Sequence, residues 1–279
     1  MQGKVVIVTG SNTGIGRVTA QDLASRGAHV IMACRSEDKT RPVVEEIRSA
    51  TGNANVEFVE LDLGSLASVR RAAQTILDRG TPIHLLVNNA GLAGSKGVTS
   101  DGFELTFGVN HLGHFLFTNL LLERMRESAP ARIVIVASKA HYKAEGLDFA
   151  AFRKPTASST AFPEYCVSKL CNVLHAKALA KRLEGTGVTT YALHPGVVAS
   201  DVWRKVPWPF RSLIKLFMIS NEEGAKTSLY CATSPDVADH SGRYYDQCKE
   251  REPSKRARDP ELAEALWARS EEWTSSTGG

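Results

Sequence analysis

Two side chains that can exchange protons lie four residues apart near the middle of the chain. In the stretch EYCVSKLCNVLHAKALAKRLEG, Tyr165 and Lys169 are one turn apart on an expected amphipathic helix, so they lie on the same face. The phenol could act as a proton donor or acceptor, and the ammonium group beside it could lower its pKa from the usual value of ~10. Because the same spacing is common between solvated side chains, the pair alone leaves both interpretations open.

A glycine-rich turn near the N-terminus supplies a second chemical feature. The apolar run KVVIVTG leads into TGSNTGIGR, which places Gly10, Gly14 and Gly16 at a change from strand to helix. Glycines there allow a tight turn and a close approach of the backbone to a pyrophosphate, and the start of the helix offers amide donors. The pattern predicts a dinucleotide site, with a turn that binds nothing as the alternative. The expected contact residues are Gly10, Ser11, Asn12, Thr13, Gly14, Ile15, Gly16 and Arg17.

The residue that follows the second apolar run bears on the choice of dinucleotide. NAD sites commonly have a carboxylate there for the ribose hydroxyls, whereas this chain has Arg35 in the run ACRS. Together with Arg17, this guanidinium favours the 2′-phosphate of NADP(H), although both arginines could instead face solvent. The adenosine side of the groove is expected to include Asp62 and Leu63 after the third run, and Asn89, Ala90 and Gly91 after the fourth.

Short apolar runs alternate with longer amphipathic stretches along the whole chain. The alternation predicts an α/β Rossmann fold, with one doubly wound, mostly parallel, seven-stranded sheet and helices on both faces, over residues 1–279. The strands are expected at KVVIVTG, AHVIMACR, NVEFVELD, IHLLVNNAG, ARIVIVAS, VTTYALHPG and GRYYD. The helices are expected near 14–25, 40–50, 65–79, 103–127, 162–184 and 222–233, with a last one at PELAEALWARSEEW.

Two long insertions interrupt this alternation, at residues 139–161 and 200–221. Both follow strands at the carboxyl edge of the expected sheet, where ligands bind in open parallel sheets. The second is rich in large apolar side chains, including Trp203, Trp208 and Phe217, and we interpret it as a lid over the substrate site. A helix that packs on the core is the first alternative, and a membrane-surface element is the second, since Arg204 and Lys205 lie among the aromatic residues.

Composition excludes several classes of protein. The net charge of +4 is spread over mixed acidic and basic stretches, which offers no nucleic-acid stripe. The five cysteines are an odd number without CxxC spacing, so we expect free thiols and no metal site. No stretch resembles a signal peptide or a membrane span, and we expect a soluble, cytoplasmic protein. His111, His114, His141 and His194 lack partners at ligand spacing and are interpreted as packing or surface residues.

The order of these motifs resembles the short-chain dehydrogenase/reductase family in its compact single-domain form. The resemblance is carried, over about residues 3 to 250, by TGSNTGIG, NNAG, GVNHLGHF, IVIVAS, YCVSK and HPG. It implies a catalytic tetrad of Asn110, Ser138, Tyr165 and Lys169. Tyr165 would be the general acid or base and Ser138 the donor to the carbonyl oxygen, while Asn110 would hold a water that reprotonates Lys169. Residues at the nicotinamide end would be Pro195, Gly196, Val198 and Ser200, besides Tyr165 and Lys169.

Within that family the chain looks most similar to the retinol dehydrogenase-like branch, through ACRS, GVNHLGHFL, SKLCNVL and GRYYDQCK. The resemblance implies an NADP(H)-dependent carbonyl reductase or alcohol dehydrogenase for hydrophobic aldehydes, ketones or alcohols. Two alternatives stay open: a light-driven tetrapyrrole-ring reductase, and a noncatalytic NADP-binding sensor. Relatives often form oligomers through the helices near 103–127 and 162–184, so a homo-oligomer is possible here.

Overall fold

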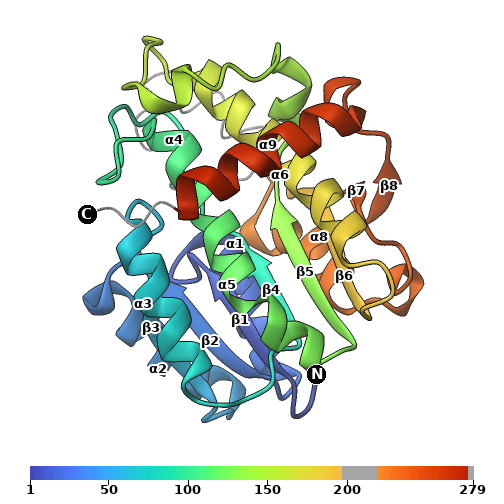
Figure 1. Cartoon of the computed structure of the whole chain (residues 1–279). Coiled ribbons are helices and arrows are strands. Elements are labelled where there is room, and N and C mark those ends of the chain that lie inside the picture. The colour runs from blue at the N-terminus through green and yellow to red at the C-terminus, as the bar shows by residue number, and fades with distance from the viewer. Residues whose placement is uncertain (197–218, 276–279) are drawn as a thin grey trace.

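The structure, a computed structural model, describes residues 1–196 and 219–275. Its strands form one sheet in the order β3-β2-β1-β4-β5-β6-β7-β8, in which β8 alone pairs antiparallel with its neighbour (Figure 1). The strands are β1 Val5–Thr9, β2 His29–Cys34, β3 Val56–Glu60, β4 Leu85–Asn88, β5 Ala131–Val136, β6 Val188–His194, β7 Arg243–Asp246 and β8 Lys249–Arg251. The mostly parallel α/β architecture of the prediction is confirmed.

Helices separate these strands as the amphipathic stretches predict. They are α1 Gly14–Ser25, α2 Glu37–Thr51, α3 Leu66–Leu77, α4 Leu105–Phe107, α5 Gly113–Glu127, α6 Phe162–Arg182, α8 Asn221–Thr233 and α9 Pro260–Ser275. A π-helical segment, η1 Gly108–Leu112, joins α4 to α5 where a single helix was expected over 103–127. Short 3₁₀ segments are η2 Lys139–Lys143, η3 Ala151–Arg153, η5 Pro235–Val237 and η6 Arg256–Arg258. Within the described ranges, no helix is long and apolar enough to cross a membrane.

Alternate residues of each strand point to opposite faces of the sheet, and each face has its own apolar core. Val6 and Val8 pack in the core that includes residues of α1, α2 and α8. Val5 and Ile7 pack in the core that includes residues of α3, α5 and α6. On this second face α9 crosses α6 and reaches toward α4 (Figure 1). The helices therefore form a layer on each side of the sheet, with α9 outside one of them.

The expected number of strands was wrong by one, because β7 turns back into β8. Asp246 pairs with Lys249, so the loop contains only Gln247 and Cys248, whose φ angles are 50° and 58°. Two successive residues with positive φ are typical of a tight hairpin turn, and glycine or asparagine usually occupies such positions. The sequence carries neither residue there, so it gave no signal for the hairpin.

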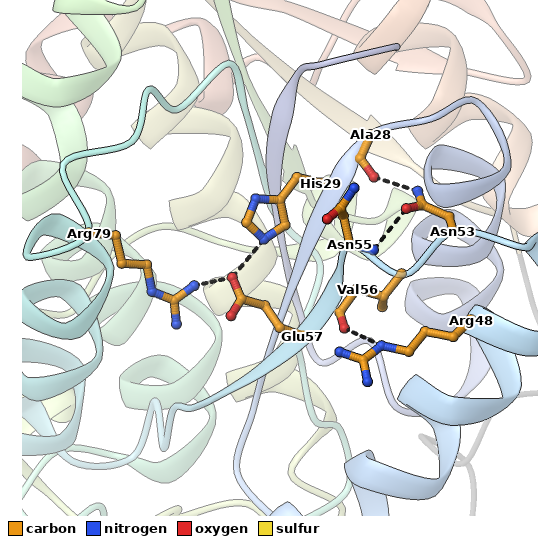
Figure 2. A network of polar contacts seen from close by, with 8 residues as sticks. All are labelled: Ala28, His29, Arg48, Asn53, Asn55, Val56, Glu57 and Arg79. Atoms are coloured by element: carbon orange, nitrogen blue, oxygen red, sulfur yellow. Dashed lines mark hydrogen bonds and ion pairs between the residues drawn. The ribbon is translucent and has the colours of Figure 1, made fainter.

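Side-chain contacts hold the end of the sheet that lies opposite the strand carboxyl ends. His29 begins β2, and its Nε2 lies 2.7 Å from Oε1 of Glu57 on β3, which also pairs with Arg79 (Figure 2). The amide of Asn53 donates to the carbonyl groups of Ala24 and Ala28, at 2.9 and 2.8 Å. These contacts hold β2 and the edge strand β3 together at the end of the sheet away from the carboxyl ends of the strands.

The insertion at 139–161 is anchored by an aromatic cluster, defined as Phe103, Phe107, Phe149, Phe152 and Trp273. The rings of Phe107 and Phe152 are stacked, with centroids 3.9 Å apart and 4° between their planes. Trp273, near the end of α9, contacts the other four rings. The C-terminal helix therefore helps to hold this insertion. The other predicted insertion, 200–221, lies outside the described residues except for its last three positions.

Candidate active site

The glycine-rich turn packs tightly against the end of β4. Gly10 has a φ of 62°, and a Cβ atom there would lie 2.8 Å from Cβ of Ala90. A Cβ on Gly16 would lie 2.5 Å from the carbonyl oxygen of Gly10. Both positions therefore require glycine. The helix α1 begins at Gly14 and has no side-chain cap at Thr13, so its first amide groups remain available to an anion.

Ser11 stabilises the glycine-rich turn through two hydrogen bonds. Its amide donates to Sγ of Cys34 at 3.2 Å, and its hydroxyl donates to the carbonyl of Val8 at 2.9 Å. The side chain is fully buried. Ser11 therefore fixes the loop against β1 and β2, while Asn12 and Thr13 lie nearer the surface.

The two arginines of the expected 2′-phosphate corner differ in their surroundings. Nη2 of Arg17 lies 2.6 Å from Oε2 of Glu46 on α2, and the arginine side chain is 41% exposed. Arg35 follows β2 and is exposed, and its guanidinium has no ion-pair partner within the described ranges. Arg35 is therefore the less constrained of the two cations.

The ends of β3 and β4 border the same groove. Oδ1 of Asp62 accepts from the amide of Gly64 at 2.9 Å, which turns this carboxylate toward its own loop. Leu63 is buried, and its carbonyl oxygen would lie 2.4 Å from a Cβ on Gly113. The loop after β3 thus packs directly on α5.

Sequence reasoning missed Thr9, the last residue of β1. Its hydroxyl accepts from the amides of Asn89 and Ala90, both at 3.0 Å, and Nδ2 of Asn89 donates to the Thr9 carbonyl at 2.9 Å. These bonds hold the NNAG segment beside the glycine-rich turn. The position of Thr9 directly before the glycine-rich turn is the one feature of the sequence that could have indicated this role.

The four residues of the predicted tetrad come from β5, η1 and α6 and lie around one point. Ser138 follows β5; its hydroxyl accepts from the Ala140 amide at 3.1 Å and acts to lower the pKa of the Tyr165 phenol. Nζ of Lys169 lies 5.7 Å from the centre of the Tyr165 ring. A Cβ atom on Gly91 would be 3.3 Å from Oδ1 of Asn110 and 3.5 Å from Nζ of Lys169. Ser138 and Lys169 therefore flank Tyr165, and Asn110 meets Lys169 at Gly91.

Burial controls the protonation of the central pair. Lys169 is 4% exposed, and burial lowers the pKa of its ammonium group to about 8. Nζ donates to the carbonyl of Val136 at 2.9 Å. Burial raises the pKa of Tyr165, while the hydrogen bond to Ser138 acts in the lowering direction. The expected lowering of the Tyr165 pKa by Lys169 is not found: burial of the phenol raises this pKa, and Ser138 is the group that acts to lower it.

Asn110 occupies the π-helical segment that interrupts the expected long helix. Its Oδ1 accepts from the amide of Leu92 at 2.8 Å, and its Nδ2 donates to the Leu92 carbonyl and to Oγ of Ser168, both at 3.0 Å. Ser168 in turn donates to the carbonyl of Tyr165 at 2.8 Å. The asparagine side chain thus ties the segment after β4 to the helix that carries Tyr165.

His141 was interpreted as a packing or surface residue, yet it contacts the backbone of Ser138. Its Nδ1 lies 2.6 Å from the Ser138 carbonyl, and its Nε2 accepts from the amide of Ser254 at 3.1 Å. Burial lowers the pKa of the ring, which is consistent with a neutral imidazole that donates from Nδ1. The segment after β8 is thereby joined to the serine turn.

At the end of β6, Gly196 has a φ of 95°, and a Cβ there would lie 2.2 Å from Cδ1 of Ile219. Pro195 and Gly196 follow His194 at the carboxyl edge of the sheet, as the sequence predicts. Val198 and Ser200, the other two residues expected at the nicotinamide end, lie outside the described residues.

Comparison with known proteins agrees with this arrangement. The family model for the short chain dehydrogenase matches residues 4–208. The chain belongs to the short-chain dehydrogenase family. It is 47% identical to human retinol dehydrogenase 12, over 96% of this chain and 85% of that protein. It is 43% identical to human retinol dehydrogenase 13, over 96% of this chain and 83% of that protein. As a member of the family, the protein is an oxidoreductase that acts on CH–OH groups, related to the retinol dehydrogenases.

Solved structures show the same fold. An uncharacterized protein from Mycobacterium paratuberculosis is 32% identical, with a TM-score of 0.79 over 98% of this chain and 94% of that chain. Pseudomonas aeruginosa RhlG, solved as a complex with NADP, is 25% identical, with a TM-score of 0.71 over 88% of this short-chain dehydrogenase and 94% of RhlG. The Rossmann-like prediction is therefore confirmed.

Proposed function

We propose that this short-chain dehydrogenase interconverts hydrophobic aldehydes or ketones and their alcohols with NADP(H). The observation that carries the proposal is the gathering of Ser138, which acts to lower the pKa of the Tyr165 phenol, and of Lys169, whose Nζ lies 5.7 Å from the centre of that ring. These groups lie at the carboxyl edge of the sheet, where the glycine-rich turn and the uncapped start of α1 form a site suited to a dinucleotide.

Bound NADPH would supply the hydride, and the chain's own residues would manage the charge and the proton. The hydroxyl of Ser138 donates a hydrogen bond to the carbonyl oxygen on which negative charge develops. Tyr165 gives its phenolic proton to the same oxygen. Lys169 stabilises the resulting phenolate, and Asn110 holds a water through which a proton returns to Lys169. In alcohol oxidation the same residues move the proton in the opposite direction.

Two observations support a hydrophobic substrate. Phe162, which is 37% exposed, stacks on Tyr165 with ring centroids 6.4 Å apart, and so offers an apolar surface beside the phenol. Human retinol dehydrogenases 12 and 13 are among the relatives, at 47% and 43% identity. A retinoid or another long apolar aldehyde is therefore the substrate class to examine first.

Steady-state oxidation of NADPH with straight-chain aldehydes of graded length and with retinaldehyde tests the proposal. We expect kcat/KM to increase with apolar length. In Tyr165→Phe, kcat should fall by about 100-fold or more, because the proton donor is lost, while the Kd for NADPH stays within twofold. A wild-type protein that binds NADPH but turns over no carbonyl compound would favour the sensor alternative. An unchanged kcat in the variant would refute the role of Tyr165.

The preference for NADP(H) rests on the exposed Arg35 after β2. We expect Arg35→Ala to lower kcat/KM with NADPH by about tenfold and to leave that with NADH nearly unchanged, since only NADPH carries the 2′-phosphate. Arg17→Ala is the matched variant and should have the smaller effect, because Glu46 already pairs with that side chain. Equal wild-type efficiency with the two cofactors would contradict the assignment.

A further inference from the structure

A buried histidine connects two parts of the site that lie far apart in the sequence. His114, in the first turn of α5, is 2% exposed. Its Nε2 lies 2.9 Å from the hydroxyl of Thr9 at the end of β1, and its Nδ1 lies 3.1 Å from the main-chain carbonyl oxygen of Asn110. One imidazole therefore bridges the strand that leads into the glycine-rich turn and the π-helical segment.

The proton positions in this bridge follow from counting donors and acceptors. The Thr9 hydroxyl has two lone pairs and one hydrogen, and the amides of Asn89 and Ala90 already donate to it. Its hydrogen is thus directed to Nε2 of His114 at 2.9 Å, since the carbonyl of Val87 is more distant at 3.4 Å. Nε2 must then be the acceptor, so the ring carries its hydrogen on Nδ1 and donates it to Asn110. Burial lowers the pKa of His114 to about 4, in agreement with a neutral ring.

The carbonyl that receives the His114 bond belongs to Asn110, a fully buried residue of the proposed tetrad. The side-chain amide of Asn110 is engaged with Leu92 and Ser168. The main-chain oxygen of Asn110 accepts from Nδ1 of His114. In the function proposed above, Asn110 holds the water that exchanges protons with Lys169. Through its bond to this carbonyl, His114 fixes the backbone that places Asn110.

We propose that His114 is a positioning residue, which aligns the Asn110 carbonyl on one side and, through Thr9, the Asn89 and Ala90 amides on the other. The proposal rests on the function proposed above. Through Asn110 the ring affects the return of protons to Lys169, and through Thr9 it affects the shape of the dinucleotide groove. The first effect depends on the bond to Asn110 and the second on the bond to Thr9, so substitutions that remove one bond at a time can separate them.

Two substitutions of His114 each keep one of the two hydrogen bonds of the imidazole and remove the other. In His114→Asn, the amide nitrogen replaces Nδ1 and keeps the bond to Asn110, whereas in His114→Gln the longer side chain places its amide near Thr9. We expect the Gln variant to lose about tenfold in kcat, with a larger solvent deuterium isotope effect and a nearly unchanged Kd for NADPH. The Asn variant should instead weaken NADPH binding about fivefold, keep most of kcat, and exchange the amide hydrogens of Asn89 and Ala90 faster.

His111 provides a matched control on the same helical stretch. It is 1% exposed, and its Nε2 lies 3.1 Å from the hydroxyl of Ser270 on α9, away from the tetrad. His111→Asn should lower the melting temperature by an amount similar to the His114 variants and leave kcat and its isotope effect unchanged. If the Asn and Gln variants of His114 behave alike, or both match His111→Asn in kinetics, the proposal is wrong.

Thr9 tests the same bridge from its other end if the His114 variants fail to fold. Thr9→Val removes the hydroxyl and keeps the shape, so we expect faster exchange at Asn89 and Ala90 and weaker NADPH binding, whereas Thr9→Ser should resemble wild type. Equal exchange in the two Thr9 variants would overturn the proposal. Since amide exchange and the Kd for NADPH need no turnover, they test His114 even if no carbonyl substrate is reduced, an outcome that would reject only the proposed function.

Discussion

Lys169 is a cation held in an apolar environment, and this burial opposes its charge. The side chain is 4% exposed, and burial lowers its pKa to about 8, well below the usual value of 10.5. The carbonyl of Val136 that accepts from Nζ also accepts from Nδ2 of Asn172 at 3.1 Å. The carbonyl would therefore stay satisfied without the lysine, so the lysine is retained at a cost to stability.

We predict that Lys169→Met abolishes turnover and yet stabilises the protein. At pH 7 the free energy of unfolding should rise by about 2 kcal/mol, because the wild-type native state must hold a buried ammonium group. Between pH 8 and about 10.5 the unfolded wild-type chain binds more protons than the folded one, so wild-type stability rises with pH and the difference shrinks. Urea unfolding at pH 7 and pH 10 measures both values. A variant less stable than wild type at pH 7 would contradict this account of Lys169.

The elements that carry the site are held together by contacts distant from the reacting groups. The insertion at 139–161 begins beside Ser138 and leads to Tyr165, and it is anchored by Trp273 of α9 through Phe149 and Phe152. The amide of Glu104 also donates to the Phe152 carbonyl at 2.8 Å. A residue in the last helix can thus influence the segment between Ser138 and Tyr165.

We expect Trp273→Ala to raise KM for the carbonyl substrate about fivefold while KM for NADPH stays constant. The reason is that the variant loosens 139–161 and leaves the glycine-rich turn intact. Trp267→Ala is the matched control, since this other α9 tryptophan packs on Phe115 and His175, away from the insertion. Both variants should lose about 2 to 4 kcal/mol of unfolding free energy. Similar KM values for the carbonyl in the two variants would argue against the anchoring role of Trp273.

At the scale of the whole molecule, α9 covers the face formed by α5 and α6, which the sequence suggested as a possible contact between subunits. The helices near 103–127 and 162–184 were a possible contact between subunits, and in the structure α9 packs on α6 and reaches α5 of the same chain (Figure 1). Ala263, Leu266 and Trp267 are buried there, and Arg182 lies over the Trp267 ring at 4.0 Å. A second copy would have to displace α9 to use this face.

We therefore predict that removal of residues 260–279 exposes an apolar face and causes self-association. Light scattering should show an increased mass, and the melting temperature should fall by several degrees or more, because the contacts of Leu266 and Trp267 are lost. A variant that lacks only 276–279 is the control and should match the full chain. A truncated protein with the mass and melting temperature of the full chain would show that α9 does not protect this face.

The sequence by itself predicted the order of the first seven strands and of the helices between them, the glycine-rich turn and, through the family resemblance, the residues of the proposed tetrad. Apolar runs buried on both faces, glycines at a strand-to-helix change and the spacing of Tyr165 and Lys169 are local patterns that can be recognised before folding. Only the tertiary structure showed what depends on contacts between distant segments. The bridge from Thr9 through His114 to Asn110 spans 105 residues on one side, and the hairpin β7–β8 depends on positive φ angles at residues without a turn signal. The pKa of Tyr165 was likewise decided by desolvation, which arises only when the chain is packed.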